Sequence, residues 1–471
     1  MRKTKIIATL GPAIESGEEL KQLIQAGVSI FRLNMSHAKH EWVKDIVKQI
    51  RAQAAGLNQT VGILLDTQGP AIRTGDLPTN LDLKEGDTFT FTVRGHVSEE
   101  AYSVDTNYDD LVSDIKVGDV VMVDNGVIQM VVRDKNENEL KCEVLTPGAL
   151  GSRRHINLPG ARVNLPALTE KDLADIQVGI ECDVDLIALS FARESKDVLQ
   201  LKELLKSKGA AHISVIAKIE DQSAVKEIEQ IVEAADGIMV ARGDLGVECP
   251  YEELPIIQRR IIKKCVASVK PVIVATHMLE SMIEKPLPTR AEITDVANAV
   301  YEEADAIMLS GETAVGKYPV KCIQVLDRVA QRIERTGNIR YHEKVVLRDT
   351  RENVGASAVH LANEMKAEGL VVFTRSGRMA RVCAGLRPEV TSIFAFTPDE
   401  QLTRRLSLYY GVIPLFLQFD EIPQKNLPEA EKLLLERKIL PEGSKVVVLS
   451  ELFVESKVIW SVQVRELGLN V

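Results

Sequence analysis

Short runs that are almost wholly apolar recur along the chain, and a segment with helical periodicity follows each of them. Eight such runs lie at residues 5–10, 29–33, 61–65, 184–189, 213–219, 237–240, 271–275 and 304–309. Runs that are apolar throughout, rather than alternating with polar residues, are typical of parallel strands covered on both faces. Eight strands that alternate with helices predict an α/β chain built on a closed (β/α)8 TIM barrel.

A long segment between the third and fourth runs interrupts this rhythm. It contains short strand-like runs at 88–93, 120–123, 127–132 and 139–145. Asp124-Asn125-Gly126, between two of these runs, is typical of a tight hairpin turn. We therefore predict an all-β domain inserted in a barrel loop, on the face where active sites lie and in the position of a lid.

A further unit follows the barrel. Helix-like segments at 352–366, 379–386 and 401–408 alternate with strand-like runs at 370–373, 393–396, 412–417, 445–449 and 458–464. This order predicts a C-terminal α/β domain with a mostly parallel sheet. The expected division is 1–69 and 169–345 for the catalytic barrel, 70–168 for the inserted β-barrel lid and 346–471 for a C-terminal regulatory domain.

The composition excludes several classes of partner. The 471 residues include 58 Lys and Arg against 68 Asp and Glu, a net charge of -10 that argues against nucleic acid or an anionic membrane as the main partner. The six cysteines form no CxxC pair and no zinc-ligand spacing, so free thiols in a reducing compartment are expected. No stretch is apolar for long enough to cross a membrane or to form a signal peptide. We expect a cytoplasmic protein.

Polar residues gather at the ends of the predicted strands, where a barrel of this kind does its chemistry. Burying so much mixed charge in one mouth costs several kcal/mol per uncompensated ion, which a ligand or metal would offset. The residues at these strand ends are Arg32, Asn34, Ser36, Asp66, Thr67, Lys218, Glu220, Gly243, Asp244, Thr276 and the segment 310–313.

The residue types at the mouth indicate a chemistry. Two carboxylates, Glu220 and Asp244, suit a divalent cation such as Mg²⁺. Arg32 offers a planar fork for a phosphate or carboxylate, and Lys218 offers a point charge for anionic oxygens. A second cation could use the neighbouring oxygen donors of Asn34, Ser36, Asp66 and Thr67. This set fits phosphoryl transfer, and it also fits enolate chemistry on a phosphorylated acid.

Seven motifs together resemble the pyruvate kinase family. They are Thr9-Leu10-Gly11-Pro12, Arg32-Leu33-Asn34-Met35-Ser36-His37, Asp66-Thr67-Gln68-Gly69-Pro70, Asn157-Leu158-Pro159-Gly160, Ala217-Lys218-Ile219-Glu220, Ala241-Arg242-Gly243-Asp244-Leu245-Gly246 and Met308-Leu309-Ser310-Gly311-Glu312-Thr313-Ala314. The resemblance implies transfer of phosphate from phosphoenolpyruvate to ADP, giving pyruvate and ATP. It also implies Mg²⁺ or Mn²⁺, K⁺, a phosphorylated effector and a homotetramer.

The resemblance also implies a role for each motif residue. Catalysis and substrate binding would use Lys218 on the transferring phosphoryl group and the enolate, Arg32 on the substrate phosphate, Gly243 and Asp244 on the substrate carboxylate, and Thr276 near the carbon that is protonated. Glu220 and Asp244 would hold Mg²⁺, while Asn34, Ser36, Asp66 and Thr67 would hold K⁺. The nucleotide would be reached from the insert by Arg73 and Arg154.

Three positions at the mouth depart from the family pattern. Ala71 stands where K⁺-dependent members have Glu and K⁺-independent members have Lys, so K⁺ dependence is an open expectation. Arg154 replaces a usual Lys, which keeps a cation but changes its geometry. His277 replaces a usual Gln beside Thr276, and we interpret it as a packing or hydrogen-bonding substitute.

The C-terminal domain offers a second candidate site. Thr374, Arg375, Ser376, Gly377 and Arg378 follow a strand and open a helix, where free backbone N–H groups favour an anion. Family resemblance favours a sugar-phosphate or nucleotide effector there, and the alternative is that Ser376 caps the helix. Residues 450–456 lack the family's Gly- and Thr-rich loop and bring two acidic residues, Glu451 and Glu455, to the place where a phosphate would dock.

Two other functions remain open on the sequence. One is a Mg²⁺-dependent lyase or aldolase acting on phosphoenolpyruvate or pyruvate, against which the inserted domain and Arg73 favour a nucleotide. The other is a non-catalytic sensor, against which the intact set of Lys218, Glu220, Asp244 and Thr276 argues. Turnover that needs ADP separates the kinase from the lyase.

Overall fold

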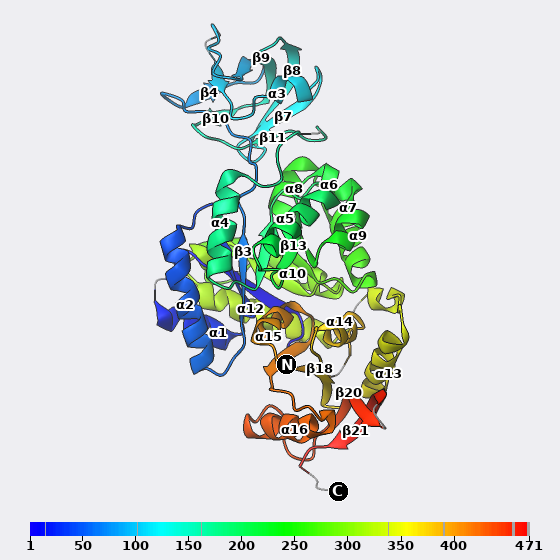
Figure 1. Ribbon diagram of the computed structural model, residues 1–471. Helices are drawn as coiled ribbons and strands as arrows, with labels where there is room; N and C mark the ends of the chain where they lie inside the picture. The colour runs from blue at the N-terminus through cyan, green and yellow to red at the C-terminus, as the bar shows by residue number, and fades with distance from the viewer. Residues whose placement is uncertain are drawn as a thin grey trace.

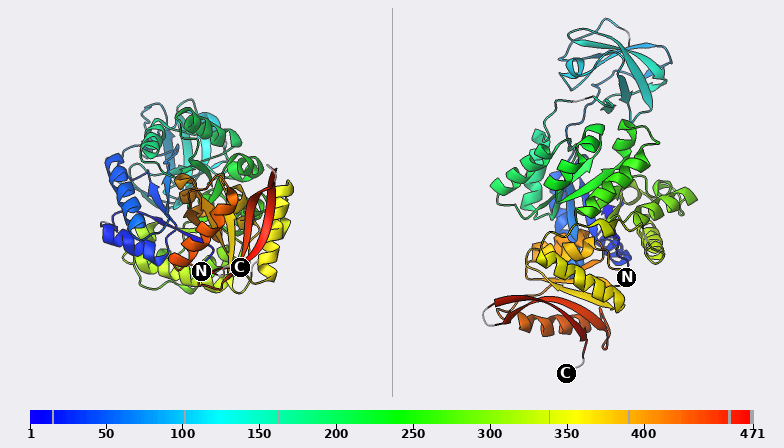
Figure 2. Two further views of the ribbon diagram at one scale, coloured as in Figure 1. Left: turned by 60° about the horizontal axis from the view of Figure 1, so that its bottom comes forward. Right: turned by 90° about the vertical axis from the view of Figure 1, so that its right-hand side faces the viewer.

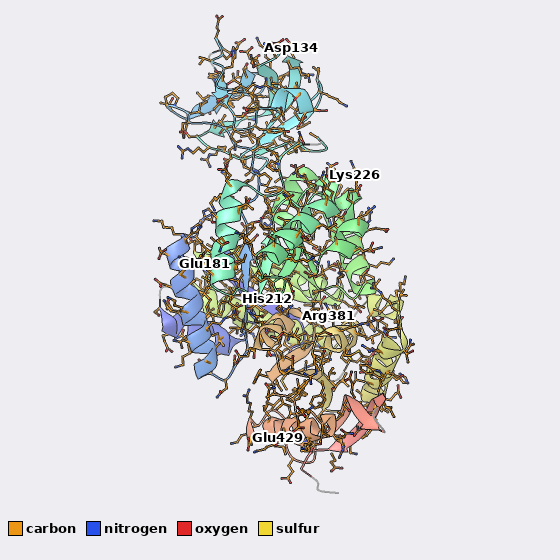
Figure 3. The ribbon with its side chains drawn as sticks, in the orientation of Figure 1. Asp134, Glu181, His212, Lys226, Arg381 and Glu429 are labelled. Atoms are coloured by element: carbon orange, nitrogen blue, oxygen red, sulfur yellow. The ribbon has the colours of Figure 1, made fainter. Side chains whose placement is uncertain are left out.

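The molecule is elongated, and three units follow one another along its length (Figure 1). The computed structural model describes residues 1–14, 16–100, 102–161, 163–337, 339–389, 391–454 and 457–468. The inserted β unit lies at one end, the barrel in the middle and the C-terminal unit at the other end, as the right-hand view of Figure 2 shows. In Figure 3, Asp134 and Glu429 lie in the two end units, and Arg381 lies where the C-terminal unit meets the barrel.

Eight parallel strands close into a barrel, which confirms the predicted fold class. The order around the barrel is β1-β16-β15-β14-β13-β12-β3-β2. The strands start and end within two residues of the predicted runs, because these runs are buried on both sides: β1 (Lys5–Thr9), β2 (Ile30–Asn34), β3 (Gly62–Asp66), β12 (Leu186–Leu189), β13 (Ser214–Ile219), β14 (Gly237–Ala241), β15 (Val272–Ala275) and β16 (Ala306–Leu309).

Helices surround the barrel and bury one apolar side each. Outer-ring helices pack around residues such as Leu23, Ile50, Leu201 and Ile262, which belong to the main hydrophobic core. The helices are α1 (Gly17–Ala26), α2 (His40–Gly56), α4 (Glu170–Glu181), α5 (Ser195–Ser207), α6 (Gln222–Lys226), α7 (Ile228–Ala234), α9 (Leu254–Ala267), α10 (Arg290–Tyr301) and α12 (Pro319–Glu334). Two short helices, α8 (Arg242–Glu248) and α11 (Gly311–Ala314), begin directly after β14 and β16.

The insert is a β structure with its own core, as predicted. Its main sheet has the order β11-β7-β8-β9-β5-β6, and a small pair joins β10 to β4. The Asp124-Asn125-Gly126 turn joins β7 to β8, and all three residues have positive φ. The elements are β4 (Leu81–Leu83), β5 (Thr88–Thr92), β6 (Ser103–Asp105), α3 (Leu111–Asp114), β7 (Val120–Val123), β8 (Ile128–Lys135), β9 (Glu139–Thr146), β10 (Gly148–Leu150) and β11 (Ile156–Asn157).

A capping box at the start of α4 lies where the chain passes between the barrel and the insert. Thr169 caps α4, and its side chain and that of Asp172 satisfy each other's backbone N–H groups. Asp172 Oδ1 also accepts hydrogen bonds from the backbone N–H groups of Gln68 and Gly69, each at 3.0 Å. The segment that leaves the barrel is therefore tied to the helix that follows the insert.

The C-terminal unit is a five-stranded sheet with the order β19-β18-β17-β20-β21. All neighbours are parallel except β20 and β21, which confirms a mostly parallel sheet. The elements are α13 (Thr350–Glu364), β17 (Gly369–Phe373), α14 (Arg378–Gly385), β18 (Ser392–Thr397), α15 (Glu400–Arg405), β19 (Val412–Phe416), α16 (Asn426–Glu436), β20 (Lys445–Val454) and β21 (Lys457–Glu466). Helix α16 is absent from the predicted pattern.

This unit covers the end of the barrel opposite the insert. Inward-facing barrel residues such as Ile7 and Met239 belong to the same hydrophobic cluster as Leu370 and Val412 of the C-terminal sheet. Buried ion pairs and hydrogen bonds cross the same boundary: Arg387 to Asp305 at 2.8 Å, Arg404 to Asp185 at 2.7 Å, and Lys5 Nζ to the carbonyl of Val412 at 2.5 Å. In the described residues no helix is long and apolar enough to cross a bilayer.

Candidate active site

A polar pocket of about 400 Å³ lies at the carboxyl ends of the barrel strands, beneath the insert. Barrel strand ends supply one wall, and the β7–β8 turn with the segment before β11 supplies the other. The pocket is lined by Arg32, Asn34, Ser36, Thr67, Gln68, Ala71, Arg73, Asp124, Asn125, Ser152, Arg153, Arg154, His155, Ser190, Phe191, Lys218, Glu220 and Asp244. Most of the strand-end residues selected from the sequence therefore come together here.

Asp66 anchors both cations of the mouth. Its Oδ2 accepts from Nε of Arg32 at 2.6 Å, and its Oδ1 lies 3.2 Å from Nζ of Lys218. Burial alone would raise the pKa of Asp66, but Lys218 and Arg32 hold the pKa below its ordinary value. The carboxylate is therefore charged, and it orients two cations toward one space.

Lys218 is held from three sides. Besides Asp66, its Nζ contacts Oε1 of Glu220 at 2.9 Å and donates to the Ser190 hydroxyl at 2.7 Å. Burial would lower the pKa of Lys218, but Asp66 and Glu220 raise that pKa above its ordinary value. The ammonium group therefore stays charged in a buried place, which suits it to stabilise negative charge rather than to act as a base.

Glu220 and Asp244 place two acidic groups in the pocket, where burial and the proximity of Asp244 disfavour negative charge on Glu220. Burial is the main cause that raises the pKa of Glu220 to about 7; Lys218 opposes the shift and Asp244 adds to it. Oε2 of Glu220 accepts from the backbone N–H of Phe191 at 2.6 Å, and Asp244 lines the same pocket. A divalent cation would offset this charge, so the residues present fit Mg²⁺.

No three His, Cys, Asp or Glu side chains gather into a metal cage anywhere in the described ranges.

The four oxygen donors assigned to K⁺ lie on adjacent strand ends, because β2 pairs with β3 from Ile30 to Asn34. Asn34, Ser36 and Thr67 line the pocket, whereas Asp66 is fully buried behind it. Oδ1 of Asn34 accepts from the N–H of Ser36 at 3.2 Å, and the Thr67 hydroxyl donates to the carbonyl of Ala188 at 3.1 Å.

Gly243 and Thr276 meet each other at the edge of the pocket rather than on its lining. The N–H of Gly243 donates to the Thr276 hydroxyl at 2.8 Å. Thr276 and His277 both have positive φ, a strained backbone that is common at functional sites. Arg242 holds this loop by donating to the carbonyls of Ala275 at 3.2 Å and Thr276 at 2.5 Å.

Arg73 and Arg154, the two residues predicted to reach the nucleotide, both line the pocket from the insert side. Nη1 of Arg73 donates to the carbonyl of Arg153 at 3.1 Å, and Nη1 of Arg154 pairs with Asp124 at 3.2 Å. His155, which follows Arg154, also lines the pocket. Burial lowers the pKa of His155; Asp244 opposes the shift and Arg73 adds to it.

Sequence reasoning missed three groups that organise the mouth. Ser190 receives the hydrogen bond from Lys218, the Thr9 hydroxyl accepts from Arg32 at 3.1 Å, and the Phe191 N–H binds Glu220. Ser190 and Phe191 directly follow the fourth apolar run, so the rule that found the other strand ends would have found them too. Thr9 is the last residue of β1 and was recognised only as part of a motif.

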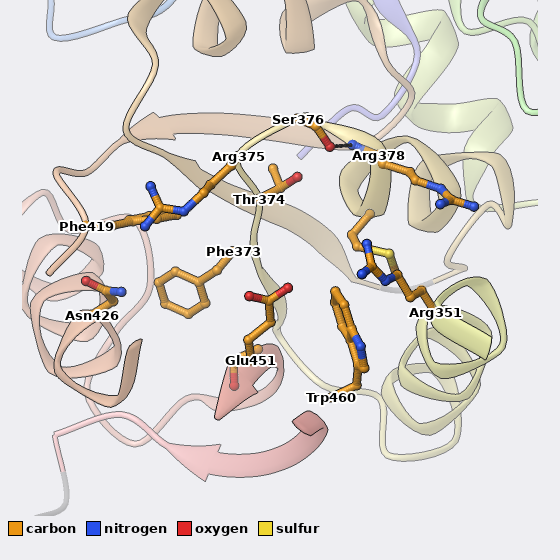
Figure 4. A pocket seen from close by; sticks show the side chains of 12 residues that line it. Arg351, Phe373, Thr374, Arg375, Ser376, Arg378, Phe419, Asn426, Glu451 and Trp460 are labelled. Atoms are coloured by element: carbon orange, nitrogen blue, oxygen red, sulfur yellow. Dashed lines mark hydrogen bonds between the residues drawn. The ribbon is translucent and has the colours of Figure 1, made fainter. Parts of the chain in front are cut away.

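The C-terminal candidate site is a separate pocket of about 220 Å³ beside the end of β17 (Figure 4). Four of the five predicted residues, Thr374, Arg375, Ser376 and Arg378, line it, together with Arg351, Phe373, Met379, Phe419, Asn426, Ser450, Glu451 and Trp460. Gly377 occupies the cap position of α14 with a φ of 77°, so Ser376 is not the helix cap.

The arginines around this pocket already have partners. Arg378 pairs with Asp349 and Glu352, both at 2.7 Å. Arg375 lies over the ring of Phe419 at 5.2 Å, and Arg351 lies over that of Trp460 at 4.7 Å. Figure 4 shows Arg375 on one side of the pocket and Arg378 and Arg351 on the other.

The strand predicted at 445–449 is longer in the structure and includes residues 450–454. They extend β20, which pairs in register with β21 from Lys445 to Val454. Strand geometry directs Glu451 into the pocket, where Figure 4 shows its carboxylate between Phe373 and Trp460. Glu455 and Ser456, the rest of the expected acidic segment, lie outside the described residues.

Comparisons with known proteins agree with this architecture. Residues 1–323 match the family model of the pyruvate kinase barrel domain, and residues 352–457 match that of the pyruvate kinase alpha/beta domain. A pyruvate kinase isozyme G of Nicotiana tabacum, chloroplastic by name, is 43% identical over 95% of this chain and 80% of its own length. A pyruvate kinase of Bacillus licheniformis is 42% identical over 95% of this chain and 77% of its own.

A solved structure leads to the same family. The crystal structure of a pyruvate kinase from Cryptosporidium parvum superimposes with a TM-score of 0.93 at 33% identity, covering 99% of this chain and 96% of that one. The barrel, the insert position and the charged mouth thus occur together in a chain related along nearly its whole length. The chain belongs to the pyruvate kinase family, whose members transfer the phosphoryl group of phosphoenolpyruvate to ADP and so form pyruvate and ATP.

Proposed function

We propose that this reaction takes place in the pocket beneath the insert, with Lys218 as the principal catalytic residue. The observation that carries the proposal is the position of its ammonium group, buried and bound to Asp66, Glu220 and Ser190. In this setting the charge is fixed before substrate arrives, so little reorganisation is needed when negative charge moves from phosphoryl oxygens to the enolate. Arg32, oriented by Asp66, binds the substrate phosphate.

Thr276 and the start of α8 complete the substrate side. The Thr276 hydroxyl lies next to the carbon that is protonated, and the backbone at Gly243 and Asp244 receives the substrate carboxylate. The N–H of Gly243 donates to Thr276 here, so substrate would have to compete for that donor. Arg73 and Arg154 bind the nucleotide phosphates from the opposite wall.

Glu220 and Asp244 are the protein ligands for Mg²⁺, with Mn²⁺ as a substitute. The bound cation neutralises phosphoryl oxygens and aligns the two substrates. The raised pKa of Glu220, caused first by burial and increased by Asp244, supports a cation at this position. Removing divalent cations with a chelator should abolish pyruvate formation, and adding Mg²⁺ back should restore it.

K⁺ is the proposed monovalent cation, with Asn34, Ser36, Asp66 and Thr67 as ligands. Because Ala71 adds no carboxylate to this wall of the pocket, binding should be weak. Ala71→Glu should increase the stimulation by K⁺ about fivefold, since one nearby charge contributes about 1 kcal/mol in a solvated site. Ala71→Lys is the matched control and should abolish the stimulation; equal stimulation in both variants would contradict the assignment.

The pocket in Figure 4 is the proposed effector site. Residues Thr374, Arg375, Ser376, Gly377 and Arg378 would bind a phosphorylated ligand, while Glu451 would oppose additional negative charge. Thermal shifts with a panel of sugar phosphates and nucleotides test this in the wild-type chain and in Glu451→Ala. A ligand that binds should bind more tightly to the variant, and no shift with any ligand in either protein would remove the proposal.

Family membership supports three further proposals. The chain forms a homotetramer, which light scattering after gel filtration would measure. It divides into domains at 1–69 with 169–345, 70–168 and 346–471. It acts in the cytoplasm, where its six free cysteines fit a reducing compartment. The tobacco relative is chloroplastic by name, so cell fractionation is the appropriate test of location.

The decisive assay measures pyruvate with each component omitted in turn. Pyruvate should form only when phosphoenolpyruvate, ADP and Mg²⁺ are all present. Turnover without ADP would indicate a lyase, and no turnover under any effector would indicate a sensor.

A further inference from the structure

One contact joins the insert directly to the helix that carries Asp244. Nδ2 of Asn157, in β11, donates to Oε1 of Glu248 at 3.0 Å. Both side chains are buried, and the carbonyl of Glu248 accepts from Nε2 of Gln222 at 2.6 Å. Glu248 is the last residue of α8, and Asp244 lies in the first turn of the same short helix. The hydrogen bond therefore connects the insert to the C-terminal end of α8, the helix that carries Asp244.

A second contact lies beside the first. Gly126, in the β7–β8 turn, lies against Val247, because a Cβ placed on Gly126 would come within 3.3 Å of the Val247 side chain. Its neighbours Asp124 and Asn125 line the active-site pocket. Figure 1 shows β7 and β11 on the side of the insert that faces the barrel, above α8. The insert thus rests on α8 through two of its own segments.

The other end of α8 is held by the barrel. Arg242 donates to the carbonyls of Ala275 and Thr276 and pairs with Asp295 at 2.7 Å. The first turn, with Gly243 and Asp244, thus keeps its place without help from the insert. Loss of the contact at Glu248 should free the insert while leaving the barrel half of the site in place.

We infer that Glu248 is a positioning residue for the nucleotide, acting through Asn157. Asn157 is three residues after Arg154 and two after His155. The backbone of His155 forms an antiparallel β-bridge with that of Arg73. Glu248 therefore fixes the distance between the arginines of the insert and the carboxylate of Asp244. The inference rests on the proposed nucleotide role of Arg73 and Arg154, and it adds a residue outside the substrate contacts to the site.

Kinetics of the wild type and of the variants Glu248→Ala, Glu248→Gln and Asn157→Ala test this inference. Glu248→Ala should raise KM for ADP about tenfold with KM for phosphoenolpyruvate within about twofold, as expected for loss of a buried hydrogen bond. Glu248→Gln keeps an acceptor oxygen and should lie within about twofold of wild type in both constants. Glu252→Ala, on an exposed side chain in the next segment, is the matched control.

The double variant Glu248→Ala with Asn157→Ala shows whether the two residues act through their shared hydrogen bond or independently of each other. If Glu248 and Asn157 act through each other, Glu248→Ala with Asn157→Ala should raise KM for ADP no more than either change alone. Amide hydrogen exchange should also become faster in residues 155–161 of each alanine variant. Asn157→Ala keeps the inference testable if Glu248→Ala fails to fold.

Two results would overturn the inference. One is an unchanged KM for ADP in a folded Glu248→Ala protein. The other is an equal rise in both KM values, which would mean a general structural role. An absence of turnover in the wild-type protein would instead contradict the proposed active site. Failure of this inference and failure of the proposed function are therefore distinguishable.

Discussion

Replacing Lys218 by Ala should remove most of kcat and leave binding of phosphoenolpyruvate nearly intact. The ammonium group contacts Asp66, Glu220 and Ser190 at 3.2, 2.9 and 2.7 Å, so it is fixed before substrate binds. Removing one fixed electrostatic donor typically costs about 2.7–4 kcal/mol of transition-state stabilisation, or roughly 10²–10³ in kcat. Arg32 keeps its own bond to Asp66, and KM for phosphoenolpyruvate should therefore change little.

The same substitution should also lower stability, because Asp66 and Glu220 lose a buried cation. Breaking a buried pair from one side costs about 3–5 kcal/mol, although Arg32 still compensates Asp66. Pyruvate formation at saturating substrates measures kcat, calorimetric titration of phosphoenolpyruvate with Mg²⁺ measures binding, and urea unfolding measures stability. Lys202→Ala is the control, since Lys202 pairs with Asp236 at 2.8 Å on the outer surface. A folded Lys218→Ala protein with kcat within tenfold of wild type would refute the reasoning.

Two other predictions concern buried charge. Arg387→Ala should lower the free energy of unfolding by about 3–5 kcal/mol, because it leaves Asp305 buried without its ion-pair partner, whereas Arg153→Ala, which breaks a solvent-exposed pair with Asp76, should leave the free energy of unfolding nearly unchanged. Similar losses in urea unfolding would contradict the role of burial. Burial raises the pKa of Glu248 from 4.5 to about 7. Because the pKa of this carboxyl is higher in the folded than in the unfolded protein, its contribution to stability is fully present below pH 4.5 and is lost as the pH rises through about 7. Gln does not titrate, so the free energy of unfolding of Glu248→Gln relative to wild type should increase by up to about 3 kcal/mol between pH 4.5 and 7. A stability difference that does not vary with pH would show that Glu248 titrates normally.

The sequence was most informative where burial is two-sided. The eight barrel strands could be predicted because most of their residues are apolar on both faces, and their ends point to the mouth because parallel strands share one direction. Helix α16 was missed even though Leu427, Ala430 and Leu434 have helical spacing and are buried. Its region lies between two strands of an α/β unit, where a helix is the expected connection.

Contacts between the three units could not be predicted from the sequence. The pairing of Asn157 with Glu248 joins residues 91 apart, and the pairing of Arg387 with Asp305 joins residues 82 apart. Both depend on how separate cores are placed against each other, which local periodicity does not encode. The length of β20 was missed for a related reason. The strand was predicted to end at Leu449, and its extension to Val454 comes from pairing with β21 rather than from the apolar run.

The first barrel strand also limits how this protein could be divided or recombined. Strand β1 begins at Lys5, whose ammonium group binds the carbonyl of Val412, and it ends at Thr9, whose hydroxyl accepts from Arg32. Burial lowers the pKa of Lys5 to about 7, because this lysine is enclosed where the C-terminal unit meets the barrel. A protein truncated after residue 345 would expose to water Lys5, Asp305 and the apolar barrel residues that pack against the C-terminal sheet. Exchange of C-terminal units between relatives would therefore succeed only when these barrel residues are exchanged together with the unit.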